Sequence, residues 1–187
     1  MFVQDVPAIT EKFTQRYGFN IVGRRDTSSG PQWVLQSGLS RFLISQRSNN
    51  PAIQPTTFSS ASYSSVDSVV NVALEVDSVE DLTSRLANGG NSVLTPPTTV
   101  RDNDGEVRYS VVKSPVGDVV HTLLNKTNYP EATFLPGFTR HHGGDDVTGQ
   151  LTSHMDHFVY VCRPGESQHV AKWYQQYFGM QRLYTSR

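Results

Sequence analysis

The chain has 187 residues, which is enough for one well-formed core or two small ones. Its formal net charge is -1 and only 18% of its residues are charged, so it offers no electrostatic basis for binding nucleic acid or an anionic membrane surface. No stretch approaches the ~18 consecutive apolar residues of a membrane span. Cys162 is the only cysteine, which excludes an intramolecular disulfide and a metal site built from cysteines alone.

The N-terminal part of the chain predicts one helix followed by three strands. The helix is expected from Pro7 to Tyr17, because proline fits a first turn and apolar residues then recur at helical spacing. Gly18 marks its end. Short β-type runs separated by Ser, Gly and Pro turns come next: Phe19–Arg25, Gln32–Ser37 and Leu39–Gln46. The polar stretch from Ser48 to Ser68 is interpreted as a connecting loop.

A second unit repeats this order behind a clear leading strand. Val69–Val76 is rich in valine and predicts that strand. Ser78 is expected as the N-cap of a helix with an acidic first turn, and Gly89 and Gly90 end it. Three further strands are expected, joined by Gly-containing and Pro-containing turns: Asn91–Leu94, Val107–Lys113 and Asp118–Leu124.

The remaining residues predict the beginning of a third unit. Residues 125–153 show no sustained periodicity and are interpreted as a linker. A strand is expected over His154–Cys162, a helix with an aromatic face over Glu166–Phe178, and another strand over Met180–Thr185. A chain that stops within a strand exposes an unpaired backbone edge, so this chain is expected to be a piece of a longer protein.

The first and third helices align with each other, since Phe13 corresponds to Tyr174 when Gly18 is set against Gly179. The pattern predicts an α+β fold of repeated βαβββ modules that form cupped mixed sheets. Residues 1–124 would hold two modules, the first strand being reduced to Phe2–Val6. Residues 125–153 would be the linker, and 154–187 the truncated start of a C-terminal domain.

Several motifs occur in one order along the chain: DNDGEVRYSVVKSPVGDVVHTLLNKTNY, FLPGF, MDHFVYVC and WYQQYFG. In this order they resemble the 4-hydroxyphenylpyruvate dioxygenase family of the vicinal-oxygen-chelate superfamily. The segments CRPG and PPTTVRD are most similar to its dioxygenase-like branch. The resemblance covers nearly all of this chain but only about half of the family's length. It implies the glyoxalase-dioxygenase fold, in which the first two modules carry no metal ligand.

The resemblance implies an Fe(II) site held by two histidines and one carboxylate. His157, in Met155-Asp156-His157, matches the first histidine, and the other two ligands are expected beyond Arg187. The strand period would put His157 on the face of Met155 and Val159, toward a barrel interior. No catalytic acid or base is assigned, and the chain by itself is expected to be inactive.

The implied reaction is the decarboxylation and hydroxylation of a 4-hydroxyphenyl keto acid with O2. The resemblance favours 4-hydroxymandelate as the product, made for a quinone head group in mitochondria. The alternatives are homogentisate formation in cytosolic tyrosine degradation and a non-catalytic structural module. The family tends to form homo-oligomers, although no interface is identified in this chain.

Other candidate residues have structural interpretations. His141, His142, Asp145 and Asp146 lie around a Gly-Gly pair that offers no rigid scaffold, so a solvated loop is expected there. His121 is expected to have a core or interface role, His154 to be exposed and Cys162 to be buried. Residues 101–105 are interpreted as a turn rather than a calcium loop. Core positions are expected for Trp173, Tyr174 and Tyr177.

Overall fold

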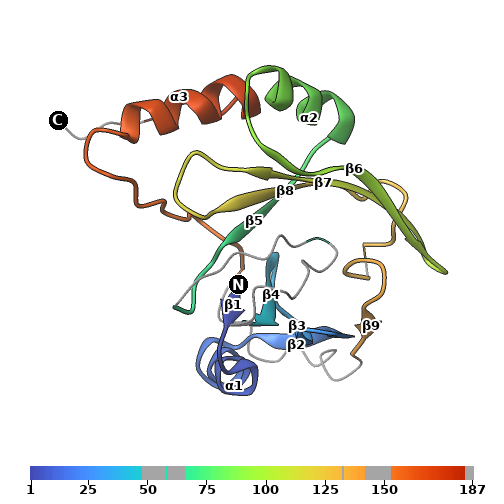
Figure 1. Ribbon diagram of the computed structural model, residues 1–187. Helices are drawn as coiled ribbons and strands as arrows, with labels where there is room; N and C mark the ends of the chain where they lie inside the picture. Colours follow the sequence, from blue (N-terminus) through green and yellow to red (C-terminus); the bar gives the residue numbers. More distant parts are fainter. Residues whose placement is uncertain (48–57, 59–65, 132, 142–152, 184–187) are drawn as a thin grey trace.

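The computed structural model describes residues 1–47, 58, 66–131, 133–141 and 153–183. Two β-sheets face each other across a shared core, and helices cover their outer faces (Figure 1). The first sheet and its helix comprise β1 (Phe2–Val3), α1 (Val6–Tyr17), β2 (Asn20–Thr27), β3 (Gly30–Ser37), β4 (Ser40–Gln46) and β9 (Thr139–Arg140). The second sheet and its helices comprise β5 (Asn71–Glu75), α2 (Val79–Asn88), β6 (Val93–Asp102), β7 (Gly105–Lys113), β8 (Val120–Asn125) and α3 (Ser167–Phe178).

The two sheets have the same internal order. The first runs β1-β4-β3-β2 and the second β5-β8-β7-β6, with β9 added beside β2. In each sheet the leading strand is parallel to the last strand, and the other pairs are antiparallel. The predicted α+β fold with two βαβββ modules is therefore confirmed.

The space between the sheets is filled by side chains. Val34 comes from the first sheet, and Val107, Tyr109 and Val111 come from β7 in the second. Alternate residues of the same strands face the opposite way, since Val112 packs against α2 and α3 instead. The central core therefore consists of Val34, Phe58, Val107, Tyr109, Val111, Val120, Leu124, Tyr129, Leu135 and Phe138.

The predicted helix ends are confirmed by their caps. Asp5 accepts a hydrogen bond from the Ala8 amide at 2.9 Å to start α1, and Ser78 accepts one from Asp81 at 3.1 Å to start α2. The helices α1 and α3 both end at a left-handed glycine, Gly18 at φ 66 and Gly179 at φ 64. This shared ending supports the internal alignment of the first and third units.

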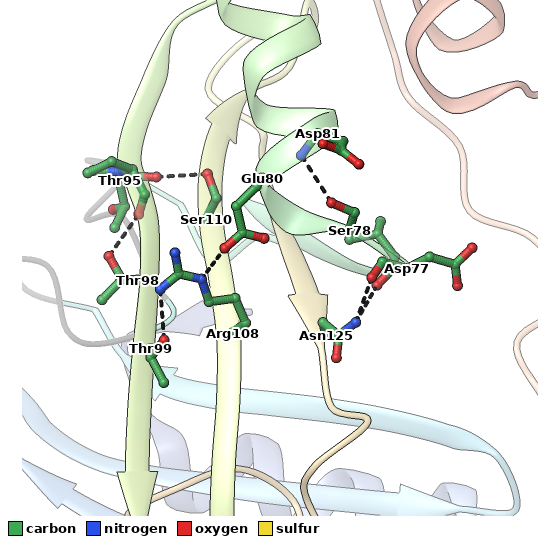
Figure 2. Close-up of polar contacts among 12 residues, drawn as sticks. Asp77, Ser78, Glu80, Asp81, Thr95, Thr98, Thr99, Arg108, Ser110 and Asn125 are labelled. Atoms are coloured by element: carbon green, nitrogen blue, oxygen red, sulfur yellow. Dashed lines mark hydrogen bonds and ion pairs between the residues drawn. The ribbon is translucent and has the colours of Figure 1, made fainter.

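A polar network holds the N-terminal end of α2 to the second sheet (Figure 2). Arg108 on β7 pairs with Glu80 of α2 and also donates a hydrogen bond to Thr99 of β6 at 2.7 Å. The hydrogen bond from Arg108 holds the pKa of Glu80 below its usual range. Asn125 at the end of β8 donates to the carbonyl oxygen of Asp77 at 2.8 Å. These contacts fix where α2 begins relative to β6, β7 and β8.

The strand β6 is longer than the sequence predicted, since it continues from Val93 through two prolines to Asp102. It is an edge strand, so a proline there need not break a ladder on both sides. The pairing with β7 shifts register between Val93 and Thr95 and again between Thr95 and Thr98. These irregularities accommodate Pro96 and Pro97, which lie beyond Leu94, where the strand was predicted to end.

Two other strand predictions are wrong for the residues that the structure describes. His154–Cys162 and the described part of Met180–Thr185 form no β-ladder. A sequence with β-type side chains becomes a strand only when a neighbouring strand receives its backbone hydrogen bonds. Within the described ranges no strand lies beside either segment in hydrogen-bonding register.

The expected linker is well packed over its first part. Tyr129, Leu135 and Phe138 are buried in the central core, and residues 139–140 form β9 against β2. Tyr129 donates a hydrogen bond to Asp102 at 2.8 Å, which joins this stretch to the end of β6. The first part of the predicted linker is thus packed against both sheets. The predicted domain boundaries stay a prediction.

Two remaining expectations concern the loop and the membrane. Most of the predicted loop from Ser48 to Ser68 lies outside the described residues, although Phe58 is placed and is buried in the central core. Among the helices that the structure describes, none has the length and apolar character needed to cross a bilayer.

Gly89 offers a direct test of how α3 packs on α2. Its φ of -81 suits any residue, but a Cβ there would lie 1.9 Å from the Tyr177 hydroxyl oxygen. We expect Gly89→Ala to lower the free energy of unfolding by ~1–3 kcal/mol, measured by urea denaturation, because α3 must shift. Adding Tyr177→Phe should recover part of the loss. Unchanged stability of Gly89→Ala would contradict this packing.

Candidate metal-binding segment

Residues 153–162 form an extended segment that leads into α3, drawn in orange in Figure 1. Its start is held by a backbone hydrogen bond from Leu39 to the carbonyl oxygen of Ser153, 2.7 Å long. Tyr160 and Cys162 are half-buried, whereas the other side chains from Ser153 to Val161 are exposed. The segment therefore contacts the rest of the described protein through alternate residues near its end.

His157 lies on the exposed part of this segment, with 73% of its side chain accessible. The Nδ1 atom of His157 lies 2.6 Å from a carboxylate oxygen of Asp156. A carboxylate can only accept, so Nδ1 donates to it, and Nε2 takes no part in this contact. The hydrogen bond and the charge of His157 hold the pKa of Asp156 below its usual range.

This arrangement corrects one expectation, and the ligand role of His157 stays a prediction. His157 was expected to point into a barrel interior, away from Asp156, but both side chains are exposed and in contact. The reason is that no second sheet covers this segment within the described residues. Histidines that bind metals usually donate their other ring N–H to a carboxylate or carbonyl, so this contact is compatible with that predicted role.

The described residues do not complete a metal site. Among them, no group of three or more His, Cys, Asp or Glu side chains could hold an ion. His154 and His141 are exposed, as expected for the first, and His142, Asp145 and Asp146 lie outside the described residues. The described residues around His157 therefore do not supply the three donors of a complete site.

His121 lies at the centre of an aromatic cluster beneath the segment and is fully buried. Its Nδ1 atom is 3.0 Å from the carbonyl oxygen of Val72, and its Nε2 atom is 2.8 Å from the hydroxyl of Tyr174. A carbonyl oxygen can only accept, so the proton sits on Nδ1 and the Tyr174 hydroxyl donates to Nε2. Both ring nitrogens are thus satisfied by a neutral imidazole, and the expected core role of His121 is confirmed.

Four aromatic rings surround the imidazole, with centroids between 5.6 and 6.1 Å away: Tyr160, Trp173, Tyr174 and Phe178. The expected core positions of Trp173, Tyr174 and Tyr177 are confirmed, since each is less than a tenth exposed. Cys162 was expected to be buried but is half-buried.

Two polar contacts that the sequence did not suggest tie α3 to the second module. Arg85 of α2 donates to the carbonyl oxygen of Tyr177 at 2.7 Å, in the last turn of α3, where helix carbonyls lack partners. The Trp173 indole donates to Asn91 at 2.6 Å. Both pairs are distant in the chain, so no local spacing could have indicated them.

Comparisons with known proteins explain this architecture. The 4-hydroxyphenylpyruvate dioxygenase-like protein of Mus musculus is 32% identical over 167 residues, covering 89% of this chain and 43% of the mouse protein. The Homo sapiens protein of the same name is 31% identical over 181 residues, covering 95% and 47%. Over this shared part, the chain belongs to the 4-hydroxyphenylpyruvate dioxygenase family. It spans about half the length of the curated relatives it matches.

The fold of the family is also seen in a solved structure. A mutant of 4-hydroxymandelate synthase from Streptomyces coelicolor superposes with a TM-score of 0.74 at 19% identity, covering 98% of this chain and 52% of the synthase. That likeness concerns the fold, and it confirms the expected vicinal-oxygen-chelate architecture. No family model matches the chain. The motif-based assignment to the 4-hydroxyphenylpyruvate dioxygenase family is confirmed by the curated relatives.

The buried imidazole predicts a pH dependence of stability. Burial lowers the pKa of His121 below 6.5, the value expected in the unfolded chain. Below pH 6.5 the unfolded chain binds the proton more readily than the folded one. The free energy of unfolding should therefore decrease as the pH is lowered. We expect up to ~1.4 kcal/mol per pH unit from this group, measured by urea denaturation between about pH 5 and 8.

The control for this prediction is His121→Asn, whose side chain does not titrate. The free energy of unfolding of this variant should be lower than that of the parent at neutral pH. Its dependence on pH should be weaker, because the contribution of His121 is missing. An identical slope in both proteins would show that other groups cause the dependence.

Proposed function

We propose that this chain is part of an Fe(II)-dependent dioxygenase acting on 4-hydroxyphenylpyruvate, with His157 as one of three protein ligands. The observation that supports it most directly is the Asp156–His157 contact of 2.6 Å, in a chain whose curated relatives are named as such dioxygenases or as dioxygenase-like. This contact leaves Nε2 of His157 available to a metal ion. The second histidine and the carboxylate of the site are proposed to lie outside the described residues.

The donor set expected for this family suits the proposed reaction. Two histidines and a carboxylate on one side of Fe(II) leave open positions at which a keto acid and O2 can be brought together. The role of this chain's residues is to supply and orient one imidazole. Asp156 accepts the hydrogen bond from Nδ1 of His157, which orients the ring and leaves Nε2 directed away from the carboxylate.

The first two modules are proposed to serve as a scaffold. The space between their sheets is occupied by the ten buried residues of the central core. Eight of the ten are apolar, and Tyr109 and Tyr129 are the two that carry a hydroxyl. Packing of this kind supports a non-catalytic role for residues 1–124, which is also the second candidate function for the chain as a whole.

The finer assignments rest on the resemblance to the dioxygenase-like branch. We propose 4-hydroxymandelate as the product: 4-hydroxyphenylpyruvate and O2 would give 4-hydroxymandelate and CO2, so one oxygen atom enters the carboxylate and the other the hydroxyl group. Use in quinone head-group synthesis and a mitochondrial location belong to the same proposal. Homogentisate formation in cytosolic tyrosine degradation is the alternative.

Metal binding tests the ligand assignment. We expect the 187-residue chain to retain far less than one Fe(II) per molecule after desalting, measured by elemental analysis, because the described residues hold no group of three donors. In the full-length protein, His157→Ala should abolish tight Co(II) or Fe(II) binding in calorimetry, with a circular dichroism spectrum like that of the parent. The control is His154→Ala, which removes an exposed neighbouring histidine. Metal binding by His157→Ala comparable to the parent would exclude His157 as a ligand.

Product analysis separates the two chemistries. The full-length protein should convert 4-hydroxyphenylpyruvate to 4-hydroxymandelate with consumption of O2, followed by liquid chromatography and mass spectrometry. Homogentisate as the product would favour the tyrosine-degradation enzyme. Absence of both products from an iron-loaded protein would favour the scaffold role.

A further inference from the structure

The segment that carries His157 has few tertiary contacts among the described residues. Its backbone joins no β-ladder, and Val159 and Val161 are 75% and 87% exposed. The contact made at its start is the Leu39–Ser153 hydrogen bond. Near its other end, Tyr160 inserts among the aromatic rings of α3 and β8. The position of His157 between these two points therefore depends strongly on how Tyr160 is held.

Tyr160 is held by a stack of rings. It lies parallel to Tyr174 of α3, with centroids 5.6 Å apart and ring planes inclined by 10°. It also forms edge-to-face pairs with the His121 imidazole and with the Phe158 ring, at centroid distances of 6.1 Å and 5.2 Å. Offset and edge-to-face pairs of this kind each contribute modestly, but together they define one orientation of the ring.

His121 determines where Tyr174 sits. The Tyr174 hydroxyl donates to Nε2 of His121, and Nδ1 of His121 donates in turn to the carbonyl of Val72 on β5. The imidazole therefore bridges β5, β8 and α3 in one chain of hydrogen bonds. A tyrosine hydroxyl in this position cannot move without leaving a buried nitrogen unpaired.

We infer that His121 is a positioning residue: acting through Tyr174 and Tyr160, it fixes the segment that carries His157 against the second module. This inference rests on the proposed function only in treating His157 as a ligand, and the fixing of the segment can be tested by itself. The sequence places His121 and His157 in different modules, so the coupling exists only in the folded structure.

Cys162 provides the probe, because it is the only cysteine and lies in the same segment. A nitroxide attached to it reports the mobility of the segment by electron paramagnetic resonance. Tyr174→Phe removes the hydroxyl and keeps the ring, so the ratio of mobile to immobile signal should rise about fivefold, as for the loss of one ordinary hydrogen bond. The matched control is Ser45→Ala, which removes the buried Gln32–Ser45 hydrogen bond in the first module and should leave the ratio unchanged.

The pH profile of the unsubstituted protein gives a second readout. Protonation of His121 reverses its hydrogen bond with the Tyr174 hydroxyl and places a charge on a fully buried ring within the aromatic cluster, which favours arrangements that open the cluster to water. The ionisable side chains described against the imidazole are Tyr160 and Tyr174, and burial raises the pKa of both, so neither titrates in acid. The mobile signal should therefore rise as the pH falls below the ordinary range of histidine, and His121→Asn should abolish this rise.

These outcomes decide the inference. It is overturned if Tyr174→Phe leaves the mobile signal unchanged, or if Ser45→Ala raises it equally. A flat pH profile of the unsubstituted protein also overturns it, and this measurement requires no variant that could fail to fold.

The full-length protein separates this inference from the proposed function. There, Tyr174→Phe should weaken Co(II) binding about fivefold, while His157→Ala abolishes it. If His157→Ala keeps its metal, the proposed function fails, although the mobility results still stand. If His157→Ala loses the metal but Tyr174→Phe changes neither mobility nor affinity, the inference fails and the ligand assignment stands.

Discussion

The burial of β7 and β8 on both faces is the constraint on which the rest of this structure depends. On one face, Val111 and Leu124 close the core between the two sheets, and on the other, Val112 and Leu123 receive α2 and α3. Because successive strand residues point to opposite sides, both layers are fixed by the same two strands. A one-residue change in their register would exchange the residues of the two cores, so neither layer would keep its packing.

His121 shows the consequence of that constraint for a polar residue. It lies on the outer face of β8 with Leu123, under α3, where a charged imidazole would have no water. Burial there is tolerated because both nitrogens find partners, one on β5 and one on α3. The same contacts give the α2 and α3 layer a defined position, which an apolar residue at position 121 would define by shape alone.

Much of the fold could be predicted from the sequence because its signals are local. The caps at Ser78, Gly18 and Gly179 lie within a turn of the helices they delimit, and the alternation in β7 lies within one strand. The errors occurred where a distant partner decides the outcome. Residues 154–162 have strand-forming side chains but no neighbouring strand in the described residues, and the prolines of β6 are tolerated only at an edge. Contacts such as Arg85 with Tyr177 leave no local trace in the sequence.

The candidate site shows the same division between local and distant information. A short motif can name the adjacent residues Asp156 and His157, but the contact between their side chains was not predicted. The position of that pair depends on how Tyr160 is held. Tyr160 packs against the rings around His121, which belongs to the second module. The second module holds one point of the segment through packed rings, and the backbone contact from Leu39 in the first module holds the other. A local motif can name the two residues, but only packing between distant parts of the chain sets where they lie.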